Sequence, residues 1–157
     1  MPQTISMEPI QFAPIQSADP LHACAATLVA AYNAAPWHDH WPHAKAHEKL
    51  LCYYHSPKFY GWTATRDGET LGCMVGNVEP YYSGDYFFLK EMFVAPQHQH
   101  QGIGRRFMEI LRAHLTTLDI QTIVLFTGMQ HFPFEFYLKS GFVEMDGMRM
   151  MAFGPTE

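Results

Sequence analysis

Residues 89–108 read LKEMFVAPQHQHQGIGRRFM, and this stretch decides the fold. Its first six residues are mostly large and apolar, as in a β-strand, and Pro96 ends the run. Glycines follow at positions 102 and 104, and apolar residues then recur at helical spacing. The stretch therefore predicts a strand, a glycine loop and an amphipathic helix in direct succession.

The junction between this loop and this helix is suited to an anion. A helix N-terminus offers N–H groups without intrahelical partners and a partial positive charge. Gly102 and Gly104 let the backbone approach a ligand closely. The third glycine of a dinucleotide fingerprint and the Gly-Lys-Ser/Thr of a P-loop are both absent. The pattern therefore favours a pyrophosphate cradle over a dinucleotide fingerprint or a P-loop. If only Gly-x-Gly is considered, a glycine-rich turn without a ligand is the alternative.

The remaining periodicity predicts an α/β (α+β) fold in a single domain, residues 1–157. We expect a mixed, mostly antiparallel sheet of about six to seven strands with about four helices. Asp67-Gly68 is a hairpin signal inside this pattern. The expected strands are 8–15, 59–66, 70–79, 86–95, 122–126, 142–144 and 148–153, and the expected helices are 20–33, 42–55, 103–115 and 131–140.

Composition excludes several classes of protein. With 48% hydrophobic and 16% charged residues the chain is globular, and a net charge of −5 without a basic tract argues against nucleic acid as a partner. No apolar run approaches the ~20 residues of a membrane span, and the amino terminus lacks signal-peptide features. The three cysteines form neither a disulfide framework nor a zinc pattern. We expect a cytoplasmic protein that does not bind a membrane.

Two motifs together resemble the GNAT N-acetyltransferase superfamily. Val94-Ala95-Pro96, Gln99-x-x-Gly102-x-Gly104 and Arg106-Phe107-Met108 resemble its motif A. About 30 residues later, Phe136-Tyr137-Leu138-Lys139-Ser140-Gly141-Phe142 resembles its motif B. The family's element order also matches the order expected here, so the resemblance covers nearly the whole chain.

The resemblance implies acetyl-CoA as co-substrate and no metal. The pantetheine arm would pair with the backbone of Met92, Phe93 and Val94 in the manner of an added strand. Gln130 stands where the family often has an asparagine that contacts the cofactor. The pyrophosphate would be held by Gln99, His100, Gln101, Gly102, Ile103, Gly104 and Arg105.

The implied reaction is direct attack of a primary amine on the thioester, which needs a proton acceptor, oxyanion donors and a proton for the thiolate. By analogy the backbone N–H near Val94 serves the oxyanion and Tyr137 protonates the thiolate. Glu91 is the candidate base, and its alternatives are that it orients substrate or faces solvent. His131, Asp85 and Glu79 are reserve bases.

The acceptor side is defined less sharply. Histidines at 38, 40, 43 and 47 suggest a metal site, but a solvated or pocket-lining segment is favoured. Trp37 and Trp41 are expected to contact the acceptor, and acidic net charge favours a small-molecule amine over a protein. A homodimer is compatible with the sequence. The main alternative is a non-catalytic module that only binds acetyl-CoA.

Overall fold

The computed structural model describes residues 8–129 and 132–155. The chain separates into two compact units, Met1–Phe126 and Thr127–Glu157. The expected pyrophosphate loop and Glu91 belong to the first unit, and Tyr137 belongs to the second. Within the described part of the chain, no helix is long and apolar enough to cross a membrane.

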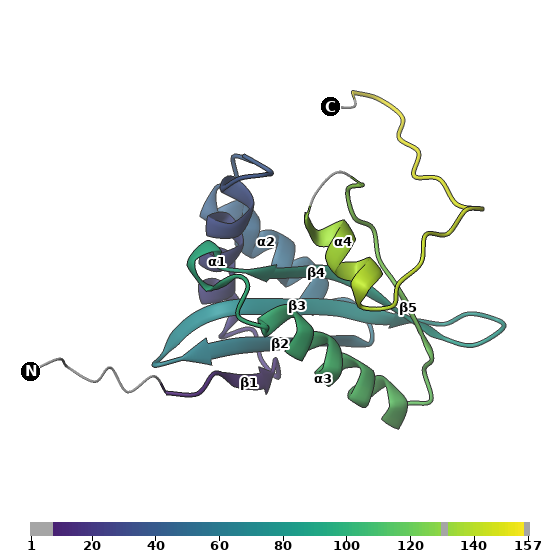
Figure 1. The fold of residues 1–157 in the computed structure, drawn as a ribbon, viewed down its shortest axis with the longest axis horizontal. Helices are drawn as coiled ribbons and strands as arrows, with labels where there is room; N and C mark the ends of the chain where they lie inside the picture. Colours follow the sequence, from purple (N-terminus) through teal and green to yellow (C-terminus); the bar gives the residue numbers. More distant parts are fainter. Residues whose placement is uncertain (1–7, 130–131, 156–157) are drawn as a thin grey trace, which may run out of the picture. The chain divides into compact units, whose positions relative to one another are not determined.

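The first unit is built on one mixed sheet (Figure 1). The hairpin predicted at Asp67-Gly68 is confirmed, because both residues have the positive φ of a tight turn, 52° and 75°. Neighbours from β1 to β4 pair antiparallel, and β5 pairs parallel with β4. The spatial order is β1 (Gln11–Pro14), β2 (Phe59–Arg66), β3 (Glu69–Glu79), β4 (Tyr86–Val94) and β5 (Thr122–Val124).

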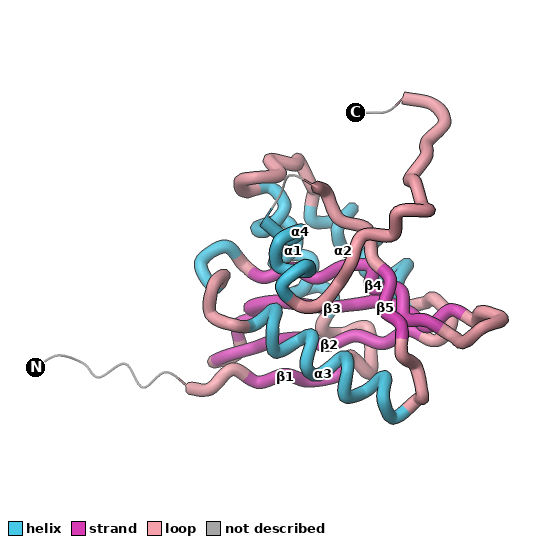
Figure 2. The backbone as a smooth tube through the Cα atoms, turned by 45° about the vertical axis from the view of Figure 1, so that its right-hand side comes forward, coloured by secondary structure: helices cyan, strands magenta, loops and turns pink. Residues whose placement is uncertain are grey.

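Helices cover both faces of this sheet (Figure 2). One face packs against α1 (Leu21–Asn33) and α2 (His43–Tyr54), and its core includes Cys73, Val75 and Phe93 from the strands. The other face packs against α3 (Ile103–Thr117), which a short 3-10 turn, η1 (Pro96–His98), precedes. Gly72 of β3 requires a glycine because a Cβ there would lie 2.9 Å from the Phe93 carbonyl oxygen of β4, and the Phe107 ring of α3 would be 3.3 Å away.

A β-bulge at Lys90 changes which way β4 presents its side chains. Val75 pairs with Glu91 while Gly76 pairs with Leu89, so Lys90 is the extra residue. Adjacent residues of a strand point to opposite faces, and so do their partners. Glu91 therefore lies on the same face as Val75, toward α1 and α2, and Leu89 lies on the opposite face. Without the bulge, Leu89 and Glu91 would share a face.

The second unit contains α4 (Phe132–Lys139), which ends where Gly141 takes a φ of 97°. The expected strands at 142–144 and 148–153 are wrong, so the described residues form five strands rather than six or seven. A turn lies between the two ranges, since the Met148 N–H donates to the Met145 carbonyl at 3.1 Å. A strand also needs a ladder partner, and this unit has no strand to supply one within its described residues.

Smaller differences concern strand lengths. β1 and β5 are shorter than the expected ranges 8–15 and 122–126. Cys24 and Cys73 are buried free thiols, whereas Cys52 is exposed. The fold class itself, α+β with a mixed and mostly antiparallel sheet, is confirmed.

Candidate functional site

The central feature of the first unit is a strand edge that opens between β4 and β5. β5 pairs with β4 only at Tyr86, Phe87 and Phe88. β4 then continues to Val94, and no other described strand takes the place of β5 beside residues 89–94. An unpaired edge presents backbone N–H and C=O groups that bind an extended, amide-containing ligand. Met92, Phe93 and Val94, the residues expected to bind pantetheine, lie in this stretch.

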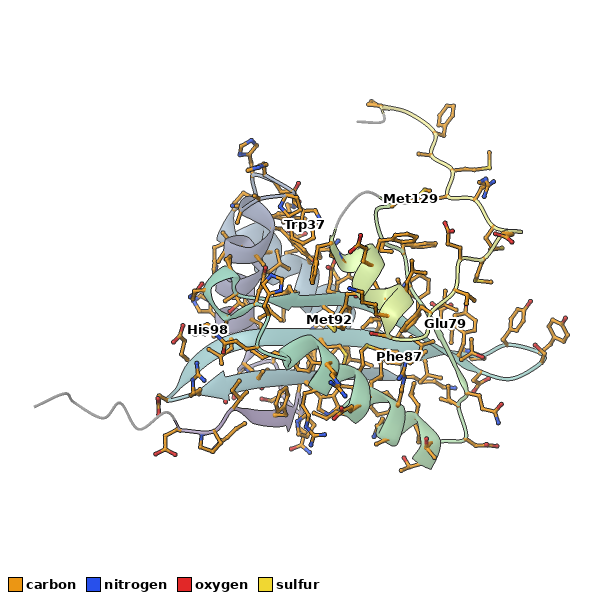
Figure 3. All side chains as sticks on the ribbon, viewed as in Figure 1. Trp37, Glu79, Phe87, Met92, His98 and Met129 are labelled. Atoms are coloured by element: carbon orange, nitrogen blue, oxygen red, sulfur yellow. The ribbon has the colours of Figure 1, made fainter. Side chains whose placement is uncertain are left out.

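The end of β4 is fastened on two sides. The Ala95 N–H donates to the Leu71 carbonyl at 2.8 Å, and the Gln99 side-chain amide donates to the Val94 carbonyl at 3.1 Å. Met92 lies on the strand and His98 lies just beyond its end (Figure 3). The Gln99 side chain thus connects the loop to the strand. Gln99 can therefore contribute its backbone, rather than its side chain, to a phosphate site.

The loop after η1 leads directly into α3 with its N-terminus uncapped. Gly102 has a left-handed φ of 84°, and α3 has neither a side-chain cap nor an acidic residue in its first turn. A Cβ built at Gly102 would meet nothing within 4 Å, so the space beside it is open. The first-turn N–H groups of α3 therefore carry a partial positive charge that no side-chain cap or first-turn carboxylate offsets, and a pyrophosphate would offset it. These residues fit the phosphate groups of a nucleotide cofactor.

Other residues of this loop differ in what they can offer. Ile103 is only 2% exposed, so it contributes its backbone alone. His100 also has a positive φ, 62°, which only a minority of non-glycine residues adopt. The Arg105 side chain is largely exposed, and its Nε lies 3.7 Å from Glu109 Oε1. Arg105 therefore pairs within its own helix and remains accessible to a ligand.

The Glu91 side chain lies on the face of the sheet that packs against α1 and α2, and residues of both helices contact it. Tyr32 of α1 donates to its Oε2 at 2.7 Å, and Tyr53 of α2 donates to its Oε1 at 3.2 Å. The Lys49 ammonium lies 3.7 Å from the same Oε1. The Glu91 side chain is 13% exposed, so the alternative that it faces solvent is excluded.

The protonation states in this cluster follow from burial and charge. Burial and the Glu91 charge raise the pKa of Tyr53, although Lys49 opposes them. Burial lowers the pKa of Lys49, but the contacts with Tyr53 and Glu91 outweigh it and the net shift is upward. Tyr53 is therefore a neutral donor and Lys49 a cation at neutral pH.

Aromatic rings surround this cluster. The Tyr32 ring lies 5.3 Å from Trp37 and 6.0 Å from Phe93, measured between centroids. The Lys49 ammonium lies 5.5 Å from the Trp41 centroid and 5.4 Å from the Tyr53 centroid. Figure 3 marks Trp37 in the loop that follows α1. Both tryptophans expected to contact the acceptor are thus joined to the Glu91 cluster.

Sequence reasoning missed Tyr32, Lys49 and Tyr53. Lys49 and Tyr53 are four residues apart and share a helix face, which is a signal available in the sequence. Tyr32 carries no such signal, because 59 residues separate it from Glu91. These contacts depend on how two helices cross the bulged strand.

The two reserve bases within the described residues, Glu79 and Asp85, make contacts in the β3–β4 hairpin rather than in the Glu91 cluster. Glu79 accepts a hydrogen bond from the Tyr86 hydroxyl and lies 3.9 Å from the Lys90 ammonium (Figure 3). Asp85 accepts the Tyr81 N–H at 3.2 Å within the β3–β4 turn. Both carboxylates therefore stabilise the hairpin. His131 and Gln130 lie outside the described residues.

Tyr137 lies in α4 of the second unit and is 8% exposed. Its ring contacts Phe136 and Phe142, with centroids 5.3 Å and 5.4 Å away. The Phe142 N–H donates to the Tyr137 carbonyl at 3.0 Å, so the turn after α4 packs back on the tyrosine. The motif-B residues thus form a local aromatic cluster that fixes the Tyr137 ring.

The histidines do not gather as a metal site. The rings of His43 and His47 lie 6.2 Å apart and both contact His22, while His38 and His40 are exposed. Across residues 8–129 and 132–155, no group of three or more His, Cys, Asp or Glu side chains could hold a metal ion. The histidine segment is a half-exposed surface of α1 and α2.

Comparison with known proteins gives a family and a fold. Residues 57–144 match the family model described as the acetyltransferase (GNAT) domain. No curated protein sequence matches the chain. An aminoglycoside acetyltransferase from an uncultured soil metagenomic sample, solved with trehalose, aligns at a TM-score of 0.74 with 12% identity, covering 94% of this chain and 97% of that one.

Two further solved structures are similar. Ribosomal-protein-alanine N-acetyltransferase from Brucella melitensis biovar Abortus 2308 aligns at a TM-score of 0.71 with 13% identity, covering 93% of this chain and 100% of that one. A predicted acetyltransferase from Clostridium acetobutylicum, solved with acetyl-CoA, aligns at 0.69 with 14% identity, covering 92% and 96%. At these identities the likeness shows the fold alone.

Proposed function

Because this chain belongs to the acetyltransferase (GNAT) domain family, we propose that it transfers an acetyl group from acetyl-CoA to the primary amine of a small molecule. One observation carries the proposal: the unpaired edge of β4 is followed, after η1 and the glycine loop, by the uncapped N-terminus of α3. The edge suits the amides of a pantetheine arm, and the helix end suits a pyrophosphate. Acetyl-CoA supplies both groups together with an activated acetyl thioester.

The cofactor contacts that we propose follow the two parts of this arrangement. Met92, Phe93 and Val94 would bind pantetheine through their backbone, although Gln99 already occupies the Val94 carbonyl. Residues 99–105 would bind the pyrophosphate, with Gly102 and the first turn of α3 supplying N–H donors. Gln130 is retained as a proposed contact. The structural neighbour from Clostridium acetobutylicum, solved with acetyl-CoA, supports this choice of cofactor.

The proposed reaction needs three proton or charge transfers. The amine nitrogen attacks the thioester carbonyl carbon, and the backbone N–H near Val94 stabilises the charge that develops on the carbonyl oxygen. The carbon–sulfur bond breaks, and the Tyr137 hydroxyl gives its proton to the departing sulfur. A phenol with an ordinary pKa of about 10 is matched to a thiolate of similar basicity. The proton that the nitrogen loses as the amide forms restores the Tyr137 hydroxyl, and the ammonium proton of the acceptor leaves toward Glu91 before the attack.

Glu91 is suited to receive that proton through a water molecule. A carboxylate offers about four lone-pair sites, and the Tyr32 and Tyr53 hydroxyls occupy two of them, while Lys49 is an ion-pair partner at 3.7 Å. The remaining sites and the small exposed fraction of the side chain leave room for a further donor. The same contacts support the alternative role, in which Glu91 only orients the acceptor side.

The competing function is a module that binds acetyl-CoA without catalysis. An acceptor screen that measures thiol release separates the two functions. We expect thiol release above the hydrolysis background with at least one primary amine. Tight acetyl-CoA binding without release on any amine of a broad panel would reject the transferase and support the module.

We also propose a homodimer. The second unit exposes a run of apolar side chains, including Val143 at 82%, Met151 at 89% and Phe153 at 106% of their reference area. Exposed apolar patches of this kind mark association surfaces. Sedimentation at increasing protein concentration tests the proposal. A mass that stays at 18.0 kDa would contradict it.

A further inference from the structure

Lys49 holds a fixed positive charge beside the candidate base. Its ammonium lies 3.7 Å from Glu91 Oε1 and over the rings of Trp41 and Tyr53. The side chain is 34% exposed, so the charge lies at the border between the protein and solvent. A carboxylate and two aromatic faces are the partners that stabilise an ammonium.

The other carboxylates of this region are also engaged. Residues 33–55 contain only two, Asp39 and Glu48. The Trp41 Nε1–H donates to Asp39 Oδ2 at 3.2 Å, and Lys45 pairs with Glu48 at 2.8 Å. Glu91 is likewise compensated by Lys49, so each of these three carboxylates already has a partner. A polycation needs a group of free carboxylates to offset its charge.

What the region does offer is aromatic surface. Tyr32, Trp37, Trp41 and Tyr53 are all partly exposed, and each contacts another member of the cluster or Lys49. Half-exposed aromatic rings bind apolar and aromatic bodies through offset or edge contacts. The chemistry of the surface therefore favours a ligand with an apolar body and a single amine.

We propose that Lys49 is a specificity-determining residue that repels polycationic acceptors and restricts the enzyme to monoamines with an aromatic or apolar body. The proposal rests on the transferase function proposed above and narrows its acceptor class. Lys49 acts by neutralising Glu91 and by placing a like charge where the additional ammonium groups of a polyamine would lie. It takes no part in bond breaking.

The experiment compares two acceptors in four forms of the whole protein. The acceptors are 2-phenylethylamine, with one amine and an aromatic ring, and spermidine, with several amines and no ring. The forms are wild type, Lys49→Met, Lys49→Arg and Lys45→Met. Met keeps the apolar stem of Lys49, Arg keeps its charge, and Lys45 is an exposed lysine one turn earlier on α2. The readout is the ratio of kcat/KM for 2-phenylethylamine over spermidine.

We expect the wild-type ratio to be well above one and to fall at least about tenfold in Lys49→Met, equivalent to about 1.4 kcal/mol. Lys49→Arg should keep the ratio, and Lys45→Met should leave it at the wild-type value. Using a ratio cancels losses common to both acceptors, such as partial unfolding. A wild-type preference for spermidine, or the same ratio in Lys49→Met, would overturn the proposal.

Failure of the transferase function would look different. Neither acceptor, nor any other amine, would then release thiol from acetyl-CoA in any of the four proteins. In that case calorimetric dissociation constants for the two amines give the same ratio, and the same tenfold change in Lys49→Met decides whether Lys49 filters charge. Equal constants in wild type and Lys49→Met would reject the filter.

Discussion

The Tyr32 hydroxyl of α1 donates a 2.7 Å hydrogen bond to Glu91 of β4, the residue that follows the bulge at Lys90. The bond joins α1, on the side proposed to bind the acceptor, to the strand proposed to bind the thioester. Because Glu91 lies on this face only through the bulge, the contact depends on strand register as well as on residue type. Removing this hydrogen bond measures how much it contributes to the stability of the Glu91 cluster.

Replacing Tyr32 with Phe should lower the free energy of unfolding by about 2 kcal/mol, since a hydrogen bond to a charged, mostly buried acceptor is lost. The ring contacts with Trp37 and Phe93 are kept. Urea unfolding measures the change. The control is Tyr54→Phe on α2, a partly buried tyrosine whose ring packs on Phe59. Equal small losses in both variants would show that the Glu91 bond contributes little.

Replacing Gly102 with Glu should raise the dissociation constant of acetyl-CoA at least about tenfold. The new carboxylate would lie at the N-terminus of α3 and compete with the phosphates for the same N–H groups. Any side chain is also strained at a φ of 84°. Calorimetric titration measures the affinity.

The matched control for this substitution is Gly68→Glu. Gly68 also has a positive φ, 75°, and a Cβ there also meets nothing within 4 Å, but it lies in the β2–β3 turn. Backbone strain and added charge are thus common to both variants, and only the location differs. Unchanged affinity in Gly102→Glu, or an equal loss in Gly68→Glu, would place the pyrophosphate elsewhere.

The parts of this site that sequence predicted are local. The strand, the loop and the helix at 89–108 follow from apolar spacing and glycine positions within one stretch, and the turn at Asp67-Gly68 follows from two adjacent residues. Lys90, Tyr32 and the final strand pair were missed or mispredicted for a common reason. A bulge, a helix–strand contact and a ladder each depend on how a segment packs against its partner, which residue spacing alone does not reveal.

Alkaline pH should destabilise the protein through the Glu91 cluster. The pKa of Tyr53, ordinarily 10.0, and that of Lys49, ordinarily 10.5, are both raised in the folded state. A raised pKa gives stability that is complete below the unfolded value and is lost as pH rises through the folded value. The free energy of unfolding should therefore fall above about pH 10.

Tyr53→Phe tests the origin of this loss. The variant removes one of the two raised groups, so its stability should fall less steeply above pH 10.0, the ordinary pKa of the tyrosine. Urea unfolding at intervals between about pH 8 and pH 11 measures the slope. Tyr54→Phe, which removes a tyrosine hydroxyl outside the Glu91 cluster, is the control. A wild-type slope in Tyr53→Phe would assign the alkaline loss to other groups.

Replacing Tyr137 with Phe should lower kcat on the order of 100-fold, the lower range for a positioned general acid. The affinity for acetyl-CoA should stay at its wild-type value, because Phe keeps the ring contacts with Phe136 and Phe142. Single-turnover thiol release measures the chemical step, and calorimetry measures the affinity. A loss of affinity equal to the loss of rate would make Tyr137 a binding residue. Wild-type turnover would remove the proposed acid, and the departing thiolate would then take its proton from solvent.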